Sequence, residues 1–175
     1  MINLTNFEGD SPFEVIFDLK KVKNSIILNY LIKGDISQLA IEEKGCLPNR
    51  IIGLWKKFCL EFYIKNKKDD NYLEFNFSSN HNWNIFTFTS IRSTLTELAT
   101  NITPELSSTI TDNEFRLEVV LANDIFNKSF PELKDMIYSP TTILNTKSGK
   151  KFHFASTHPD NKLDFHRYKS FDQSL

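Results

Sequence analysis

An unbroken alternation of apolar and polar side chains between Tyr72 and Ser78 is the feature that most constrains the fold. Successive side chains of a strand point to opposite faces, so this stretch predicts a half-buried β-strand. Its apolar face carries Leu73, Phe75 and Phe77, and its polar face carries Tyr72, Glu74, Asn76 and Ser78. The polar face is either solvated, as one face of an antiparallel sheet commonly is, or it lines a site for a polar ligand.

Strand patterns of the same kind recur along the chain, and turn-forming residues separate them. The predicted strands cover Phe13–Leu19, Ser25–Ile32, Leu39–Ile41, Leu60–Lys65, Tyr72–Phe77, Trp83–Thr89, Phe115–Leu121, Thr141–Asn145 and Phe152–Ala155. The strands at 60–65 and 72–77 pair naturally as a hairpin across Asn66–Asn71. Short strands at this spacing predict an all-β fold, a single antiparallel β-sandwich that spans residues 1–175.

Helical signals are weak by comparison. The stretch Ser90–Ala99 predicts one or two turns at most, because its four Thr and Ser residues disfavour a long helix. The stretch Asn123–Phe130 predicts a short helix that Asn123 or Asp124 caps and Pro131 ends. We therefore expect one or two short helices beside the strands.

The composition argues against several classes of protein. A formal net charge of −1 gives no basic surface for nucleic acid. The chain has no run of about 18 apolar residues, so we expect no membrane span. Its first residues lack a basic region followed by an apolar run, so we expect no secretory signal and a cytoplasmic location. Two cysteines, Cys46 and Cys59, are too few for a disulfide framework.

Sequence motifs of common enzymes and cofactor sites are missing. The chain has no Gly-rich phosphate loop, no Gly-x-Ser-x-Gly, no His-Glu-x-x-His and no Cys-x-x-Cys. Two carboxylates, Glu61 and Glu74, could act as acid and nucleophile in glycoside hydrolysis if the strand register places them on one face. An ion pair with Arg50 or Arg92 is a commoner role for such residues, so we expect a protein that is not an enzyme.

Three aromatic residues suit a sugar site. Sugar rings have apolar faces and polar rims, so their sites combine an aromatic platform with a few polar groups. The sequence offers Trp55, Tyr63 and Trp83 for such a platform. The alternative is that both tryptophans fill the core.

A group of polar residues near the C-terminus could hold a metal. His158, Asp164 and His166 fall within nine residues, and Asp160 is a further possible ligand. No further strong ligand stands nearby at a known spacing. We therefore favour a loop pinned by hydrogen bonds from histidine to the backbone, and we expect no bound metal.

Three blocks of the sequence follow a family pattern. The first, Leu54–Tyr63, is similar to Leu-Trp-x-x-Thr-Cys-Phe-Glu-x-Phe. The second, Tyr72–Arg92, is similar to Tyr-x-Glu-Phe-Asn-Phe-Ser-Pro-x-x-x-Trp followed by aromatic positions and Tyr-Arg. The third, Thr157–Phe171, is similar to His-Pro-x-x-x-Pro-Asp-Phe-His. In these blocks the chain resembles a bacterial family of DOMON-like domains, which are related in fold to type 9 carbohydrate-binding modules.

The chain departs from this family where Thr, Phe, Pro, Tyr and Pro are usual and it has Phe58, Leu60, Ser79, Ile91 and Leu163. Loss of the aromatic residue before Arg92 could alter a ligand platform, while the other changes are mild for the fold. The resemblance implies a β-sandwich with a sugar or haem ligand, since DOMON relatives bind both. Together with the polar strand face, it gives the candidate ligand-binding residues Trp55, Glu61, Tyr72, Glu74, Asn76, Trp83, Arg92, His158, Asp164 and His166.

These observations predict a non-catalytic domain that binds a carbohydrate or a similar polar small molecule. A cytoplasmic location favours a soluble saccharide or metabolite over a polysaccharide. One alternative is a haem- or metal-binding domain that uses His158 or His166, in which a His–Met pair would require Met136. Another is a protein-interaction domain whose partner meets an exposed sheet edge or the polar strand face.

Overall fold

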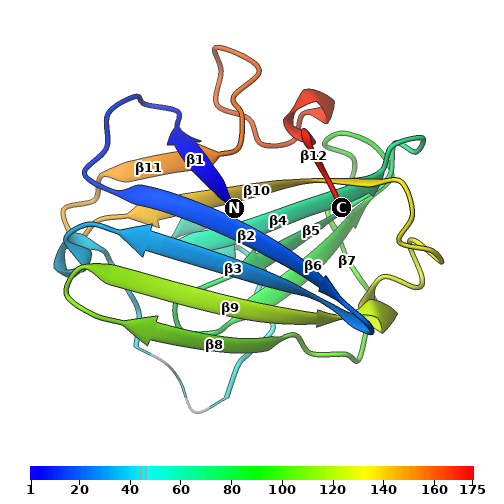
Figure 1. Ribbon diagram of the computed structural model, residues 1–175, viewed down its shortest axis with the longest axis horizontal. Helices are drawn as coiled ribbons and strands as arrows, with labels where there is room; N and C mark the ends of the chain where they lie inside the picture. The colour runs from blue at the N-terminus through cyan, green and yellow to red at the C-terminus, as the bar shows by residue number, and fades with distance from the viewer. Residues whose placement is uncertain (44, 46) are drawn as a thin grey trace.

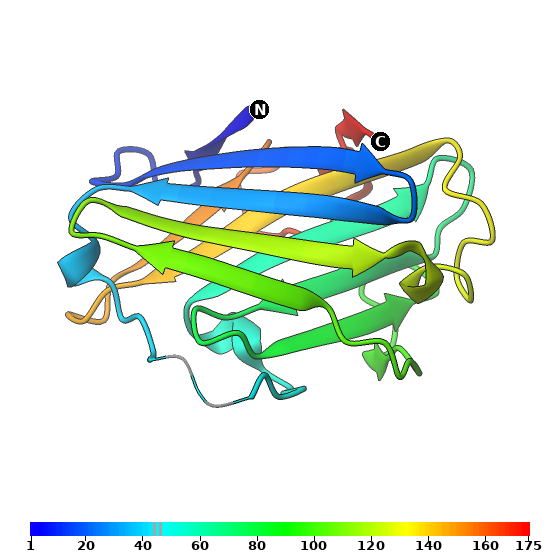
Figure 2. The same cartoon turned by 60° about the horizontal axis from the view of Figure 1, so that its bottom comes forward.

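The chain folds into a curved antiparallel sheet that closes over itself as a two-layered sandwich (Figures 1 and 2). This structure is a computed structural model, described for residues 1–43, 45 and 47–175, so Cys46 lies outside the described residues. That part of the chain contains the strands β1 (Ile2–Asn6), β2 (Glu14–Val22), β3 (Ser25–Lys33), β4 (Cys59–Asn66), β5 (Tyr72–Phe77), β6 (Trp83–Phe88), β7 (Thr96–Glu97), β8 (Glu105–Ile110), β9 (Glu114–Ala122), β10 (Met136–Asn145), β11 (Lys151–Ala155) and β12 (Gln173–Ser174).

Four short 3-10 helices stand between the strands of the described chain: η1 (Ile36–Gln38), η2 (Leu54–Lys56), η3 (Asn123–Ile125) and η4 (Tyr168–Ser170). Among these described residues, no helix has the length and apolar character that crossing a membrane requires. The antiparallel pairing of the strands and the shortness of the helices in the described chain confirm the predicted all-β antiparallel sandwich.

The first strand joins the two layers. The strand order is β7-β6-β5-β4-β10-β11-β1-β2-β3-β9-β8. Within β1, Leu4 pairs with Val15 of β2, and Thr5 pairs with Ala155 of β11. Figure 2 shows the layer of β2, β3, β9 and β8 in front of the layer that contains β10, β4, β5 and β6.

The core lies between these layers, because each strand turns its apolar residues inward. Along β3, buried and half-buried residues alternate, as the sequence pattern predicts. Phe17 of β2 stacks against Phe62 of β4 across the interior, with ring centroids 6.2 Å apart. The hydroxyl of Tyr30 donates a hydrogen bond of 2.6 Å to the backbone carbonyl oxygen of Glu61, so a polar contact also joins the layers.

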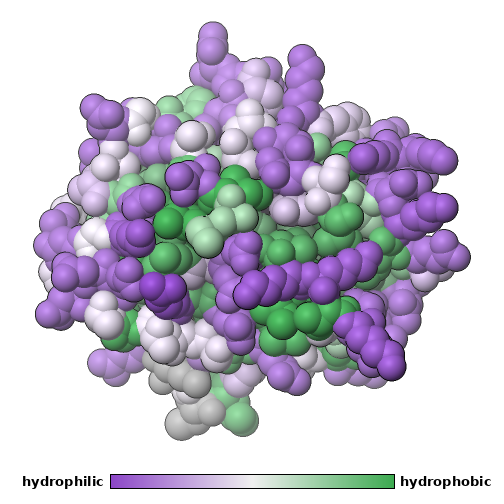
Figure 3. All heavy atoms as spheres, viewed as in Figure 1, coloured by the Kyte–Doolittle hydropathy of each residue, from purple (hydrophilic) through white to green (hydrophobic). Residues whose placement is uncertain are grey.

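The two layers differ on their outer faces. Figure 3 looks onto the layer of β2, β3, β9 and β8, where hydrophilic side chains stand among hydrophobic ones. By contrast, every residue of β5 is buried, so the prediction of a half-buried strand is wrong for its polar face. The C-terminal segment, residues 157–172, packs over that face. Its Phe165 and Phe171 share a second apolar cluster with Leu54, Cys59, Tyr63, Tyr72, Phe86, Phe88, Ile143 and Ala155.

Several predicted elements differ from the structure. Leu39 forms an isolated bridge to Thr146, so Leu39–Ile41 is not a strand. Residues 90–99 form no helix and contain β7 instead. The predicted helix at 123–130 is only η3, and its N-cap is Ala122, which makes no side-chain cap. The patterns missed β1, β8 and β12, because β1 and β12 are short and β8 has few apolar residues.

Candidate functional site

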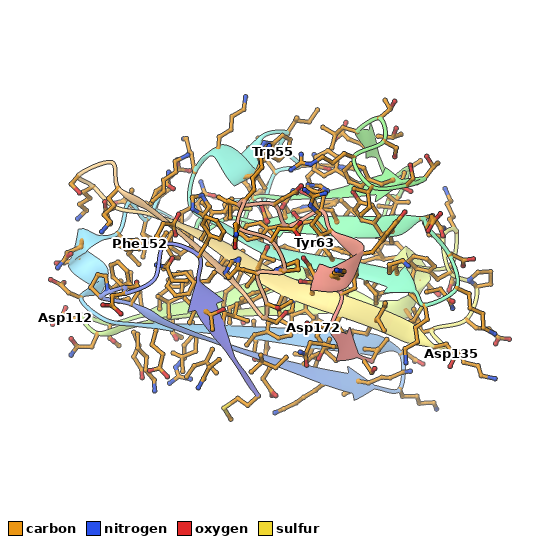
Figure 4. All side chains as sticks on the ribbon, turned by 90° about the horizontal axis from the view of Figure 1, so that it is seen from above. Trp55, Tyr63, Asp112, Asp135, Phe152 and Asp172 are labelled. Atoms are coloured by element: carbon orange, nitrogen blue, oxygen red, sulfur yellow. The ribbon has the colours of Figure 1, made fainter. Side chains whose placement is uncertain are left out.

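A cavity of about 410 Å³ opens on the outer face of the β4–β5 hairpin, beside the C-terminal segment. Figure 4 shows Trp55 and Tyr63 on the side of the sheet where this segment passes. Its wall consists of Trp55, Glu61, Tyr63, Glu74, Phe88, Arg92, Ser93, Leu95, Ile143, His153, Leu163, Asp164, Phe165 and His166. The volume falls in the usual range for small-molecule sites, roughly 300–1,000 Å³. Six of the ten predicted site residues line it: Trp55, Glu61, Glu74, Arg92, Asp164 and His166.

The strand register brings the two glutamates to one face. Tyr63 lies directly opposite Glu74, and Glu61 lies directly opposite Asn76. Because residues that share a face alternate along a strand, Glu61 and Glu74 are diagonal neighbours. Neither glutamate forms an ion pair with Arg50 or Arg92, since Arg50 binds Glu97 and Arg92 binds Asp164.

Both glutamates are almost completely removed from solvent. Glu61 is 1% exposed and Glu74 is 3% exposed. Burial raises the pKa of both carboxyl groups, and the proximity of Glu61 raises that of Glu74 further. The neutral forms are thereby favoured, since a buried charge without a partner is costly.

Hydrogen bonds fix the positions of these carboxyl groups. Glu61 Oε2 accepts from the hydroxyls of Tyr63 at 3.0 Å and Thr141 at 2.8 Å. Glu74 Oε1 accepts from the side-chain amide of Asn76 at 2.7 Å. Asn76 therefore acts on the cavity through Glu74, and is not itself on the cavity wall.

A neutral histidine stands beside Glu74. Burial lowers the pKa of His166 to about 4. Its Nδ1 is 2.7 Å from the hydroxyl of Tyr72, and its Nε2 is 3.6 Å from Glu74 Oε2. The latter distance exceeds that of a hydrogen bond, and the lowered pKa of His166 favours its uncharged form, so this contact is not an ion pair. Tyr72 thus orients His166 without lining the cavity.

Arg92 and Asp164 fasten the C-terminal segment to the loop after β6. Asp164 accepts from Arg92 Nη2 at 2.6 Å and Nε at 3.3 Å, and from the backbone N–H of His166 at 3.0 Å. Arg167 Nε adds an ion pair at 3.1 Å. Burial alone would raise the pKa of Asp164, but the bonds from Arg92 and His166 lower it, so this carboxylate stays ionised. The side chain of Arg92 remains 58% exposed at the cavity mouth.

The two tryptophans occupy different environments. Trp55 is half-buried in η2, and its ring packs edge-on against Phe86 at 5.6 Å. Trp83 points to the other face of the sheet, where it belongs to the main core and is 5% exposed. Trp83 therefore fills the core, as the alternative interpretation of the tryptophans expects, whereas Trp55 offers an aromatic surface to the cavity.

His158 also lies away from the cavity wall. Its Nε2 donates to the backbone carbonyl oxygen of Thr5 at 2.8 Å, which is the pinned-loop arrangement that the sequence analysis favours. Among residues 1–43, 45 and 47–175, no three His, Cys, Asp or Glu side chains form a group that could hold a metal ion.

Other residues of the cavity wall were not among the residues predicted from the sequence. Ile143 and His153 face each other across β10 and β11, and Phe88 ends β6. Their alternation within the strands was visible in the sequence, but the pairing of β10 with β4 joins segments about 80 residues apart. No local pattern predicts such a pairing.

Comparison with known proteins identifies the fold. The sequence matches no protein-family model and no curated protein. A candidate carbohydrate-binding protein from Bacteroides uniformis matches with a TM-score of 0.68 and 14% identity, over 97% of this chain and 84% of that chain.

Two further matches are structures of a family 9 carbohydrate-binding module from Caldicellulosiruptor kristjanssonii. The complex with cellotriose has a TM-score of 0.54 and 11% identity, over 93% of this chain and 74% of that chain. The complex with glucose has a TM-score of 0.51 and 10% identity, over 92% of this chain and 76% of that chain. This chain therefore shares the fold of these modules.

Proposed function

We propose that this protein is a non-catalytic binding domain that holds a soluble saccharide in the cavity between η2, the β4–β5 hairpin and the C-terminal segment. The proposal rests on the composition of the cavity wall, which contains both a half-buried tryptophan and buried carboxyl groups. We propose a cytoplasmic role and a DOMON-like relationship, on the sequence features that predict them.

The chemistry of the wall suits a polyhydroxylated ring. Trp55 offers an aromatic surface to the apolar C–H face of a sugar. A neutral carboxyl group has both a hydrogen-bond donor and acceptors, so Glu61 and Glu74 can bind hydroxyl groups in either sense. Arg92 adds an exposed donor at the mouth.

The fold supports the same class of ligand. The family 9 modules that share it were solved with cellotriose and with glucose. The histidines of the haem and metal alternative are each held by protein groups, His158 by the Thr5 carbonyl oxygen and His166 by the Tyr72 hydroxyl. Those contacts favour a structural role for both.

A thermal-shift screen followed by titration calorimetry tests the proposal. The purified protein should gain stability with at least one of glucose, glucosamine, N-acetylglucosamine or a short cello-oligosaccharide, by about 2.7 kcal/mol at 100 times the dissociation constant. Trp55→Ala should weaken that binding by about tenfold, since a lost aromatic contact is worth about 1 kcal/mol or more.

Tyr168→Ala is the matched control, because Tyr168 is an exposed aromatic residue outside the cavity wall. It should leave the affinity unchanged. If no saccharide stabilises the protein, or if Trp55→Ala binds as tightly as the native chain, the proposal is wrong.

A further inference from the structure

The cavity wall carries more carboxyl groups than cations. Glu61, Glu74 and Asp164 all line it, whereas Arg92 is its one guanidinium among the described residues. Asp164 already takes the bidentate contact of Arg92 and the ion pair of Arg167. Burial raises the pKa of Glu74 and the charge of Arg92 acts to lower it, but within the described chain Arg92 forms its ion pair with Asp164 and none with Glu61 or Glu74.

No lysine or arginine in the described chain forms an ion pair with Glu61 or Glu74 within 4.0 Å. Lys65 is the nearest lysine along β4, but its Nζ lies over the ring of Tyr168, off the cavity wall. His153 is on the wall, where it pairs with Glu8. Glu61 and Glu74 therefore have no ion-pair partner from a lysine or arginine of the described chain. A cationic ligand in the cavity would provide one.

One oxygen of Glu74 has no hydrogen-bond partner among the described residues. Its Oε1 is held by Asn76, whereas Oε2 has only His166 Nε2, at 3.6 Å. This oxygen belongs to a side chain that is 3% exposed and lies on the cavity wall. A donor supplied by a ligand would satisfy it, and burial makes an unmade bond costly.

On these grounds we propose that the saccharide bound here carries a free amino group, whose ammonium lies between Glu61 and Glu74. The proposal rests on the proposed function and narrows it to amino sugars. A charged donor shared by two carboxyl groups makes stronger hydrogen bonds than a hydroxyl does. Conversion of a buried carboxyl to its ionised form then becomes favourable, because the ammonium compensates the charge.

The titratable groups around Glu74 are consistent with loss of its proton when an ammonium group binds. They are Cys59, Glu61 and Tyr63 on β4, Tyr72 on β5, Arg92 after β6, and Asp164 and His166 in the C-terminal segment. Burial and Glu61 raise the pKa of Glu74, so the free protein holds a proton there. Binding of an ammonium group should release it.

Titration calorimetry with four probes tests the inference: glucosamine, glucose, N-acetylglucosamine and cyclohexylamine. At about pH 6, where the ligand amine is charged, glucosamine should bind at least about tenfold more tightly than the other three. Titrations in two buffers that differ in ionisation enthalpy should show release of about one proton per glucosamine.

Variants locate the ammonium site. Glu74→Gln should reduce the preference for glucosamine over glucose to less than about twofold and abolish proton release, because it removes the charge that the ammonium needs and weakens glucosamine binding far more than glucose binding. If that variant does not fold, Glu61→Gln should reduce the preference in the same way. Glu118→Gln, an exposed carboxyl group on β9, should change neither quantity.

The outcomes separate the two proposals. Equal affinities for glucose and glucosamine would overturn the amino-sugar inference and leave saccharide binding standing. Cyclohexylamine that binds as tightly as glucosamine would also overturn it, because hydroxyl groups would then contribute nothing. Failure of all the saccharides to bind would overturn both.

Discussion

Burial of Glu74 should make the stability of the fold depend on pH. The folded protein holds a proton on this carboxyl group at pH values where the unfolded chain, with its ordinary pKa of 4.5, has released it. The free energy of unfolding should therefore fall as the pH rises above that value. Glu74→Gln removes the titration, so it should exceed the native protein in stability at neutral pH by about 1–3 kcal/mol.

Denaturant unfolding at a series of pH values measures this effect. The gain from Glu74→Gln should shrink towards zero as the pH falls to the ordinary carboxyl pKa. Glu118→Gln, at an exposed position, should shift the stability by less than about 0.5 kcal/mol at every pH. A Glu74→Gln variant that is less stable than the native protein at neutral pH would contradict the buried, neutral carboxyl.

The position of a site residue could be predicted from the sequence where it depends only on the residue's own strand, and not where it depends on how two strands pair. The alternation within β5 correctly joined Tyr72, Glu74 and Asn76 on one face. The place of Trp83 was not predictable in the same way, because its face depends on the register between β5 and β6. In that register Trp83 lies opposite Phe77, and hence in the core.

At the scale of elements, the C-terminal segment turns one outer face of the sandwich into an enclosed site. Asp164 holds it, since this 7%-exposed carboxylate binds Arg92, Arg167 and the backbone of His166. Asp164→Asn should loosen residues 163–171 and lower the free energy of unfolding by about 1–3 kcal/mol. The exposure of Arg92 keeps the expected loss below that of a fully buried pair.

Hydrogen exchange monitored by mass spectrometry checks this expectation, with faster exchange in peptides from residues 163–171 and unchanged exchange in β3 and β9. Glu114→Gln is the matched control, because it removes an exposed ion pair with Arg116 on β9 and should cost at most about 0.5 kcal/mol. Unchanged exchange in the segment of Asp164→Asn would show that packing of Phe165 and Phe171 alone holds it.

The strands of the sandwich were predictable from the sequence, whereas the C-terminal cover was not. Period-two patterns identified β2, β3, β4, β5 and β9, because the inner face of a sandwich demands alternation. They could not show that residues 157–172 cover a second face, because a segment without regular structure has no period. The fully buried β5 is the result of that cover.

For the whole molecule, the connections between the layers predict cooperative unfolding. A single core cluster takes residues from both layers, among them Phe17 and Phe62. The hydroxyl of Tyr30 reaches across to the Glu61 backbone, and β1 pairs with a strand of each layer. Neither layer can separate without exposing this shared apolar surface to water.

We therefore expect one unfolding transition, with coincident midpoints for tryptophan fluorescence and far-ultraviolet circular dichroism. The two tryptophans make the comparison informative, since Trp55 lies at the cavity and Trp83 lies in the core. Leu4→Ala, in the strand that joins the layers, should lower the midpoint by an amount equivalent to about 2–4 kcal/mol while the transition stays single. Two separate transitions, in either the native protein or this variant, would mean that the layers fold independently and that residues 1–175 are not one cooperative domain.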